Sequence, residues 1–316
     1  MAAELIETRW IWRNGEVIPW ADAQVHVLTI AVQFGASVFE GIRAYRTPKG
    51  PAVFRLQDHI RRLFDSCRIY RMDPGFSREE IEQACLQLIA ANELEECYIR
   101  PMVLRGYGTA GLNPIGTKVD TYIATWPWGT YLGAGALENG VDVCVSSWRR
   151  PAPDTFPAMA KAAGHYNNCQ LIKAEAVLNG FAEAIALSPE GLVSEGSGQN
   201  LFLVRDGTVI TPSVDGTFLH GITRDSIMAV ARDLGIPVRE QRVPREMVYV
   251  ADELFFCGTA AEVTPVRSVD RIPIGAGGVG PITRRIQERF MDIVHGAVDD
   301  VHGWLTPVPQ LERTGR

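Results

Sequence analysis

The stretch "EAIALSPEGLVSEGSGQNLFLVRDGTVITP", residues 183–212, shapes the expectation for the C-terminal half of the chain. Its apolar runs are separated by turn residues, and Asp206-Gly207 is a strong hairpin signal. The stretch therefore predicts two pairs of strands. Between them, Glu195 lies among glycine and serine residues, which leave room for a ligand to approach the backbone.

Beyond this stretch, helices are expected where apolar residues recur at helical spacing between start and stop signals. Such segments cover residues 58–72, 77–94, 165–179, 223–235 and 281–296. Strand-like runs cover residues 37–45, 52–56, 97–108 and 119–128, and a hairpin turn is expected at Asn14-Gly15. This mixture predicts an α/β (α+β) fold of packed layers. A segment rich in glycine and aromatic residues, 126–137, is interpreted as the connection between domains at 1–125 and 138–316.

The composition fits a globular protein with a substantial core, since 46% of the residues are hydrophobic and 22% are charged. A net charge of -6 disfavours a nucleic-acid surface or a polybasic membrane face. No stretch reaches the roughly 18 consecutive apolar residues of a membrane span, and the first residues do not have a signal-peptide pattern. The six cysteines are scattered without a C-x-x-C pair. This predicts reduced thiols, no metal site and a cytoplasmic location.

The pattern G-x-G-x-x-G occurs twice, at residues 106–111 and 275–280. A dinucleotide site also needs a strand before the glycines, a helix after them and then a second strand. The first copy has no helix after it, and the second has no later strand with an acidic end. Both copies are therefore interpreted as loops.

The chain has only four lysines among its 31 basic residues, so few amines are available for covalent chemistry. Lys49 and Lys118 lie in expected loops, and Lys173 lies on an expected helix with a solvated face. Lys161, in "AMAKAAGHYNNC" (residues 158–169), is flanked by small side chains that leave room for a bulky group. A desolvated lysine has a lowered pKa and becomes a nucleophile that can form a Schiff base. Taken alone, the same pattern also fits an ordinary solvated lysine.

Other segments offer the remaining groups that a pyridoxal 5'-phosphate site requires. Glu195 can bond a protonated pyridine nitrogen. The expected helix start at 222–223 and the small-residue turn at 259–260 offer backbone N–H groups for anions. Arg62, in "HIRRL", adds a cation. Each feature alone also fits a structural role, as a loop glutamate, a helix cap, a turn or a solvated arginine, but the combination is much more specific.

Seven motifs resemble, in their order, those of the branched-chain aminotransferases, which are pyridoxal-phosphate enzymes of fold type IV. The motifs are "FGASVFEGIRAY", "YIRP", "PWGTYLG", "AKAAGHY", "SEGSGQNLF", "GITRDS" and "CGTAAEVTPVRSVD". The resemblance runs from about Trp10 to Trp304 and so covers nearly the whole chain.

The resemblance implies a smaller N-terminal α/β domain and a larger C-terminal domain, with the cofactor between them. Lys161 would be the Schiff-base lysine and would carry the proton between the substrate α-carbon and the cofactor. Tyr166 would bond the phenolate oxygen of the ring, and Glu195 would pair with its nitrogen. The phosphate and the remaining parts of the cofactor would be held by Arg62, Leu219, Ile222, Thr223 and Thr259.

The resemblance also implies how one pocket accepts two kinds of substrate. Arg100 would bind the distal carboxylate of glutamate, the usual amino donor. The hydroxyl of Tyr98 and the amides of Thr259 and Ala260 would bind the substrate α-carboxylate. The other substrate contacts would come from Phe34, Phe39, Gly41, Trp128 and Tyr131, and from Leu112 of a second subunit.

Two residues depart from the family pattern. Phe34 stands where the family usually has a tyrosine, which removes a hydroxyl near the distal-carboxylate site and bears on the preferred donor. Gln199 stands where many members have a glutamate, which changes the local charge.

The leading hypothesis is a branched-chain-amino-acid transaminase. It would exchange amino groups between leucine, isoleucine or valine and 2-oxoglutarate by a ping-pong mechanism. Its partners would be these small molecules and further copies of the chain, in a dimer at least and up to a hexamer. Alternatives on the same fold are a D-amino-acid or (R)-amine transaminase and an aminodeoxychorismate lyase. From other classes, a nicotinamide-dependent oxidoreductase and a catalytically silent binding protein stay open.

Overall fold

The computed structural model describes residues 5–129, 132–133, 135–214 and 216–309. The chain divides into two compact units. Unit 1 comprises Met1–Gly129, Ala160–Gly164 and Ile293–Arg316, and unit 2 comprises Thr130–Met159 and His165–Asp292. Contacts thus group the short lysine segment at 160–164 with unit 1, although both of its neighbours in sequence belong to unit 2. The division at 126–137 from the sequence stays a prediction.

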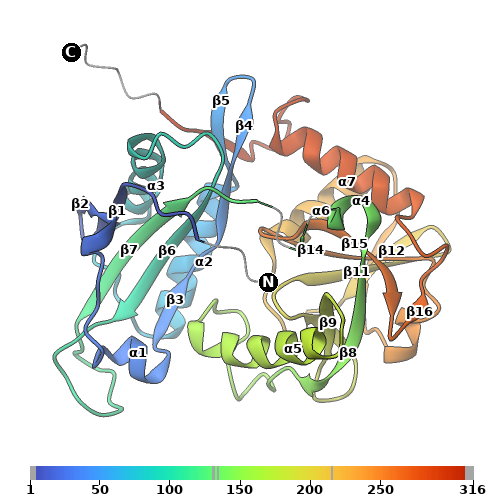
Figure 1. The fold of residues 1–316 in the computed structure, drawn as a ribbon, viewed down its shortest axis with the longest axis horizontal. Coiled ribbons are helices and arrows are strands. Elements are labelled where there is room, and N and C mark those ends of the chain that lie inside the picture. The colour runs from blue at the N-terminus through green and yellow to red at the C-terminus, as the bar shows by residue number, and fades with distance from the viewer. Residues whose placement is uncertain (1–4, 130–131, 134, 215, 310–316) are drawn as a thin grey trace. The chain divides into compact units, whose positions relative to one another are not determined.

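The described part of unit 1 is built on an antiparallel sheet of eight strands (Figure 1). Its order is β17 (Leu305–Pro307), β5 (Gly50–Phe54), β4 (Ile42–Thr47), β6 (Cys97–Arg105), β7 (Val119–Trp126), β1 (Trp10–Arg13) and β2 (Glu16–Pro19), with β3 (Ser37–Phe39) beside β6. The turn between β1 and β2 lies at Asn14-Gly15, where both residues have positive φ, as the hairpin signal predicts.

The helices of unit 1 are α1 (Ile30–Phe34), α2 (Leu56–Ile69) and α3 (Arg78–Ala91), with the short 3₁₀ helix η1 (Trp20–Asp22). The Ser77 side chain accepts the N–H of Glu80, and the Glu80 carboxylate accepts the N–H of Ser77. This is the capping box that the sequence predicts. Ile60 and Leu63 of α2 are fully buried in the core of this unit, together with Ile81 of α3.

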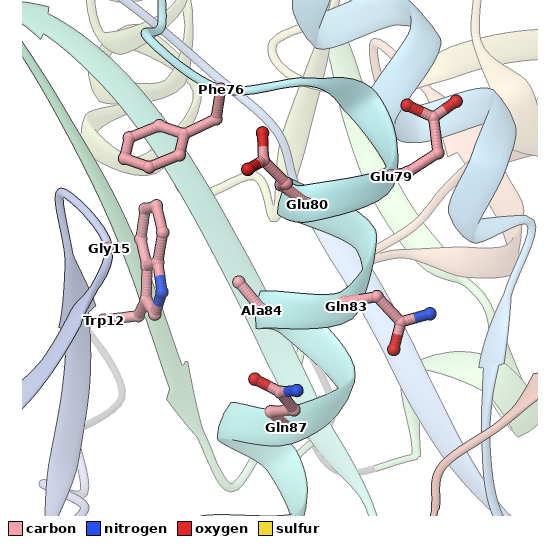
Figure 2. Close-up of a pocket in the computed structure, with 8 residues that line it drawn as sticks. All are labelled: Trp12, Gly15, Phe76, Glu79, Glu80, Gln83, Ala84 and Gln87. Carbon is pink, nitrogen blue, oxygen red and sulfur yellow. The ribbon is translucent and has the colours of Figure 1, made fainter.

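A hollow with a volume of about 380 Å³ lies along α3 (Figure 2). Trp12 and Phe76 form one wall, with ring centres 4.9 Å apart. The lining residues are Trp12, Gly15, Phe76, Glu79, Glu80, Gln83, Ala84 and Gln87. None of them is a predicted site residue.

Unit 2 is built on a mixed sheet that has nine strands in the described residues. Its order is β10 (Val193–Gly196), β9 (Glu183–Leu187), β8 (Val141–Arg149), β15 (Glu262–Val269), β14 (Glu253–Gly258), β11 (Asn200–Arg205), β12 (Thr208–Pro212) and β13 (Val238–Gln241), with β16 (Ile272–Pro273) beside β15. The two predicted strand pairs at 183–212 are present as β9–β10 and β11–β12.

The helices of unit 2 are α4 (Ala136–Asn139), α5 (Tyr166–Leu178), α6 (Ile222–Asp233) and α7 (Pro281–Val294), whose last two residues belong to unit 1. The 3₁₀ helices are η2 (Ala163–His165), which starts in unit 1, and η3 (Arg245–Val248). Helix α5 packs on β8 and β9 through Ile172 and Ala176 (Figure 1). Helix α7 begins at Pro281, as its sequence predicts.

The predicted runs at 97–108 and 119–128 extend past the strand ends at Arg105 and Trp126, and the other two predicted strands differ for tertiary reasons. The run at 37–45 is divided into β3 and β4 at Glu40 and Gly41, where the N–H of Glu40 still bonds the carbonyl of Pro101 in β6, but Pro101 has no N–H to return the bond. The run at 52–56 ends at Phe54, because Arg55 has a φ of 51° and Leu56 already starts α2. Both differences follow from tertiary contacts that a local pattern does not contain.

Across the described residues, no helix is both long enough and apolar enough to cross a membrane.

Candidate active site

The backbone of Lys161 is bonded to unit 1 on two sides. Its carbonyl accepts the N–H of Phe39 at 3.0 Å, and its own N–H donates to Ser66 Oγ at 3.0 Å. Ala162 forms an isolated bridge with Val38. The alanines on either side of the lysine are buried, so the predicted small neighbours serve close packing against β3 and α2.

The environment of Lys161 changes the acidity of its amine. Burial lowers the pKa of Lys161, and the nearby charge of Arg62 lowers it further, while Glu40 acts in the opposite direction. The Nζ atom lies 5.2 Å from the ring centre of Phe39. A lowered pKa increases the unprotonated fraction, which is the nucleophilic form of an amine. The chemistry predicted for Lys161 therefore has a physical basis.

Arg62, the predicted phosphate ligand, is paired with a glutamate that the sequence analysis missed. Its Nε and Nη2 atoms donate to the two carboxylate oxygens of Glu40 at 2.6 and 2.9 Å. Burial alone would raise the pKa of Glu40, but the charge of Arg62 and the contact with His59 outweigh it and hold this pKa well below its usual range. Burial also lowers the pKa of His59. We therefore assign a neutral His59 that donates its Nδ1–H to Glu40 at 2.7 Å.

Arg100 is the cation of unit 1 that faces aromatic rings. Its guanidinium carbon lies 4.8 Å from the ring centre of Phe39 and 5.2 Å from that of Tyr98. The Nε atom is buried and without a hydrogen-bond partner, and no carboxylate of the described chain pairs with this arginine. A partly buried cation without an anionic partner can bind the carboxylate of a ligand, to which its N–H groups donate.

The position of the Tyr98 hydroxyl requires a glycine at residue 41. A Cβ atom on Gly41 would lie 1.9 Å from the hydroxyl of Tyr98, so only glycine allows this hydroxyl its position. The ring of Tyr98 lies 4.7 Å from that of Trp128. Phe39 and Tyr98 thus lie against Arg100, and Trp128 lies against Tyr98; their role in substrate binding stays a prediction.

In unit 2, Glu195 lies on β10 and is buried. Arg150, at the end of β8, places its Nε atom 3.1 Å from Glu195 Oε1. The same guanidinium donates to Asn168 Oδ1 at 2.7 Å and lies 3.2 Å from Cys169 Sγ, both in the first turn of α5. Burial lowers the pKa of Arg150, but Glu195 raises it and the net pKa is above its usual value. Glu195 therefore faces a permanent positive charge on one side. Tyr166 is the first residue of α5, so it lies on the same turn.

Asn200 connects Glu195 to the start of α6. Its Nδ2 atom lies 3.4 Å from Glu195 Oε2 and donates to the carbonyl of Leu219 at 3.1 Å. A Cβ atom on Gly221, the N-cap of α6, would lie 1.9 Å from Asn200 Oδ1. This glycine therefore permits the close approach that joins the two segments.

The first turn of α6 is suited to an anion. The N-cap residue is a glycine, which has no side chain to cap the helix, and Thr223 is buried in the first turn. The N–H groups and the dipole of a helix start favour a phosphate. Ile222 and Thr223 lie in this first turn, and their phosphate role stays a prediction.

The turn between β14 and β15 offers a second anion site. Among the described residues, no acceptor is bonded to the amide of Thr259 or Ala260. Strand pairing sets Asn200 beside Cys257, and Gly258 lies close to the carbonyl of Gly198. This turn therefore starts next to the 196–199 loop that follows Glu195.

The predicted residues thus gather in two groups, one in each unit. In unit 1 these are Phe39, Gly41, Arg62, Tyr98, Arg100, Trp128 and Lys161, and in unit 2 they are Tyr166, Glu195, Leu219, Ile222, Thr223, Thr259 and Ala260. Phe34 and Leu112 are exposed, and Tyr131 lies outside the described residues. Four residues of these groups were not predicted from the sequence: Glu40, His59, Arg150 and Asn200. A glutamate inside the apolar run 37–45 was the available signal for Glu40, because a carboxylate in a buried strand needs a cation.

Comparison with known proteins shows the family to which the chain belongs. The family described as "Amino-transferase class IV" matches residues 37–269. The branched-chain-amino-acid aminotransferase of Escherichia coli (strain K12) is 50% identical over 302 residues, which cover 95% of this chain and 98% of that protein. The crystal structure of an E. coli branched-chain amino acid aminotransferase has a TM-score of 0.94 at 50% identity and covers 96% of this chain and 100% of its own.

A third similar protein was solved in its holo-form. It is the branched-chain amino acid aminotransferase of Thermobaculum terrenum in its PLP-form, with a TM-score of 0.89 and 38% identity. The match covers 96% of this chain and 99% of that chain. This chain belongs to the class IV amino-transferases. The resemblance to branched-chain aminotransferases and the α/β fold of fold type IV are therefore confirmed.

Proposed function

We propose that this protein is a pyridoxal 5'-phosphate-dependent transaminase of branched-chain L-amino acids, with Lys161 as its catalytic amine. Branched-chain aminotransferases are 50% identical to the chain over 95% of its length. The observation that carries the role of Lys161 is the placement of its amine 5.2 Å from the ring centre of Phe39, where burial and the charge of Arg62 lower its pKa. Leucine, isoleucine or valine would be the amino acid and 2-oxoglutarate the acceptor.

The donor set fits the cofactor. A phosphorylated pyridine aldehyde needs an amine, a carboxylate for the ring nitrogen and N–H groups for the phosphate. The chain offers Lys161, Glu195 and the start of α6 at 222–223. When bound, the cofactor supplies an electron sink that makes the proton on the substrate α-carbon more acidic.

Each of the proposed site residues then has a defined role. Lys161 would bind the cofactor and afterwards accept the α-proton on Nζ, and its lowered pKa keeps that nitrogen unprotonated and available. Arg62, Ile222, Thr223 and Thr259 would hold the phosphate, and Leu219 would contribute to the rest of the cofactor site. Glu195 keeps the ring nitrogen protonated, and Tyr166 donates to the phenolate oxygen.

Substrate binding uses one cation and an apolar wall. Arg100 binds the distal carboxylate of glutamate, supported by its lack of an anionic partner in the described chain. Phe39, Trp128 and Tyr131 exclude water around an aliphatic side chain, and Gly41 leaves room for Tyr98. The Tyr98 hydroxyl and the amides of Thr259 and Ala260 bind the α-carboxylate. A hydrophobic pocket distinguishes side chains by only about 1–3 kcal/mol per methylene.

A second copy of the chain completes the pocket. Exposed apolar residues gather on two neighbouring segments of unit 1, where the ring centres of His26 and Tyr107 lie 4.4 Å apart. They are Val25, Val27, Leu28, Val32, Phe34, Tyr107, Leu112 and Ile115. An exposed apolar patch of this kind is typical of a protein interface. We infer at least a dimer, in which Leu112 reaches the partner's substrate. Sedimentation velocity tests this, and a monomer in the presence of cofactor would contradict it.

A cytoplasmic location is supported by the thiols. All six cysteines are buried and none forms a disulfide, which is typical of a reducing compartment.

The half-reactions test the proposed function. Purified protein with cofactor should convert L-leucine and L-glutamate in single-turnover measurements, and D-alanine or an (R)-amine far more slowly. Arg100→Leu should lower kcat/KM for glutamate by about 100-fold or more, because a charged hydrogen-bonded contact is lost. The same variant should change kcat/KM for leucine much less. Preferred conversion of D-alanine or of the (R)-amine would replace the proposal with one of the alternatives on this fold.

A further inference from the structure

Glu40 is a fully buried carboxylate that none of the proposed roles uses. It follows β3 and accepts four hydrogen bonds. These come from His59 Nδ1 at 2.7 Å, Arg62 Nε at 2.6 Å, Arg62 Nη2 at 2.9 Å and the N–H of Gly41 at 3.2 Å. A buried carboxylate persists only where such donors compensate its lost hydration. The carboxylate and Arg62 therefore form one unit of structure.

The contact with Glu40 determines how Arg62 is oriented. Two donors of one guanidinium on two oxygens of one carboxylate fix both the plane and the direction of the arginine head. The side chain of Arg62 is 13% exposed. Arg62 is thus held in place before any ligand arrives, which reduces the entropy cost of binding an anion.

The same cluster is tied to Lys161 through the backbone. Ser66 donates its hydroxyl hydrogen to the carbonyl of Arg62 at 2.9 Å and accepts the N–H of Lys161 at 3.0 Å. The carbonyl of Lys161 bonds Phe39, the residue directly before Glu40. The carboxylate, the guanidinium and the backbone of Lys161 are therefore tied to one another.

Four groups act on the charge of the Lys161 amine. Arg62 and Arg100 disfavour its protonated form, and Glu40 and Tyr98 favour it. His59 adds no charge, since burial lowers its pKa and keeps it neutral. Glu40 is the carboxylate among these groups. It is ionised in the neutral pH range, because its pKa is held far below that range.

We propose that Glu40 is a positioning residue of the active site, which orients Arg62 toward the cofactor phosphate and offsets the charge of Arg62 at Lys161 Nζ. This inference rests on the proposed function, because it assumes that the cofactor binds at Lys161. It assigns two measurable effects to one carboxylate. The first is on the affinity for a phosphorylated ligand, and the second is on the pH at which the lysine nitrogen gains its proton.

A double-mutant cycle tests the first effect. The dissociation constant for pyridoxal 5'-phosphate is measured for the cofactor-free full chain and for Glu40→Gln, Arg62→Gln and the double variant. We expect Glu40→Gln to weaken binding roughly tenfold in the wild type and less than about threefold when Arg62 is already Gln. Pyridoxal, which lacks the phosphate, should bind wild type and Glu40→Gln nearly equally. Equal weakening in both backgrounds would overturn the proposal.

A pH titration of the visible absorbance of the cofactor-loaded protein tests the second effect. Loss of a negative charge near a protonated nitrogen lowers its pKa. The midpoint should therefore move to lower pH in Glu40→Gln. The matched control is Glu40→Asp, which keeps the charge and should move the midpoint less. An unchanged midpoint in a folded Glu40→Gln protein would contradict the proposed charge effect.

Two outcomes separate this inference from the proposed function. If the wild-type protein binds no pyridoxal 5'-phosphate, the proposed function fails first. If it binds and Glu40→Gln behaves like the wild type, only the role of Glu40 fails. Should Glu40→Gln not fold, Glu40→Asp replaces it, because it preserves the buried charge and shortens the reach to Arg62. Weaker binding of the phosphorylated ligand alone then supports the proposal, and wild-type affinity overturns it.

Discussion

The two units each contain a buried arginine–glutamate pair, and the two pairs have opposite tasks. In unit 1 the arginine of Glu40–Arg62 is the expected cofactor ligand and the glutamate supports it. In unit 2 the glutamate of Arg150–Glu195 is the expected ligand and the arginine supports it. In both cases the ligand was predicted from its motif, whereas its support was not. A motif thus indicates the group that is expected to meet the cofactor, and the fold provides the opposite charge behind it.

The supports also differ in what they hold together. Glu40 collects donors from the start of α2 and from its own turn. Arg150 connects β8, β10 and the first turn of α5, through Glu195, Asn168 and Cys169. Unit 1 thus has a compact local cluster, and unit 2 has a clamp across three elements.

Removal of Arg150 is expected to have the largest effect on stability. Arg150→Met leaves Glu195 buried without its charged partner, so the free energy of unfolding should fall by about 3–5 kcal/mol. Urea unfolding of the cofactor-free protein measures this. Arg150→Met combined with Glu195→Gln should recover much of the loss, because no buried charge then lacks a partner. A loss below about 1 kcal/mol in the single variant would mean that Arg150 is not the main support of Glu195.

Substitution of Gln199 should have a smaller effect on the stability of unit 2. Here an amide, rather than a charged group, supports a buried carboxylate. Its Nε2 atom donates to the buried carboxylate of Glu183 at 3.0 Å, and Lys173 Nζ lies 3.1 Å from the same oxygen. Lys173 is therefore paired rather than solvated as the sequence suggested. Gln199→Glu would set two carboxylates against one ammonium group and should cost roughly 1–3 kcal/mol at neutral pH.

The loss of stability in Gln199→Glu should depend on pH in a defined direction. Like-charge repulsion raises the pKa of one carboxyl in the folded state above its unfolded value. The deficit should therefore be largest at high pH and shrink as pH falls through that raised pKa. Gln199→Met removes the same hydrogen bond without adding charge, so its cost should stay constant between about pH 5 and pH 8. A deficit of Gln199→Glu that grows on acidification would refute this explanation.

The smallest effect on stability is expected at an exposed ion pair. Its comparison with the buried pairs shows how much burial strengthens such a contact. Arg267 Nε donates to Asp142 Oδ1 at 2.9 Å on the surface of unit 2. This hydrogen bond lowers the pKa of Asp142 to about 2. Its stabilisation is therefore present above the unfolded pKa near 3.8 and is lost as pH falls toward about 2. Because solvent screens the pair, Asp142→Asn should cost less than about 1 kcal/mol in urea unfolding at neutral pH.

Local signals made much of the fold predictable. The capping box at Ser77 and Glu80, the hairpin turns at Asn14-Gly15 and Asp206-Gly207, and the helix start at Pro281 each depend on a few neighbouring residues. All of them are present in the structure. The same locality explains the two misjudged strands, since the breaks at Glu40 and Arg55 depend on partners far away in the sequence.

The candidate site was predictable to a lesser degree, for the same physical reason. Lys161 and Glu195 stand out because small neighbours surround them in the sequence. Arg150 and Asn200 have no such signature, since their contacts arise from strand order and helix packing. Their roles become visible only when the distances to Glu195 are known.

One measurement tests the central claim most directly, namely where the cofactor binds covalently. The cofactor-loaded protein is reduced with borohydride and digested, and the pyridoxyl-modified peptide is identified by mass spectrometry. We expect modification at Lys161, and a Lys161→Ala protein that is colourless and inactive, while Lys173→Ala keeps its colour. Modification at Lys49, Lys118 or Lys173, or full transamination by Lys161→Ala, would contradict it.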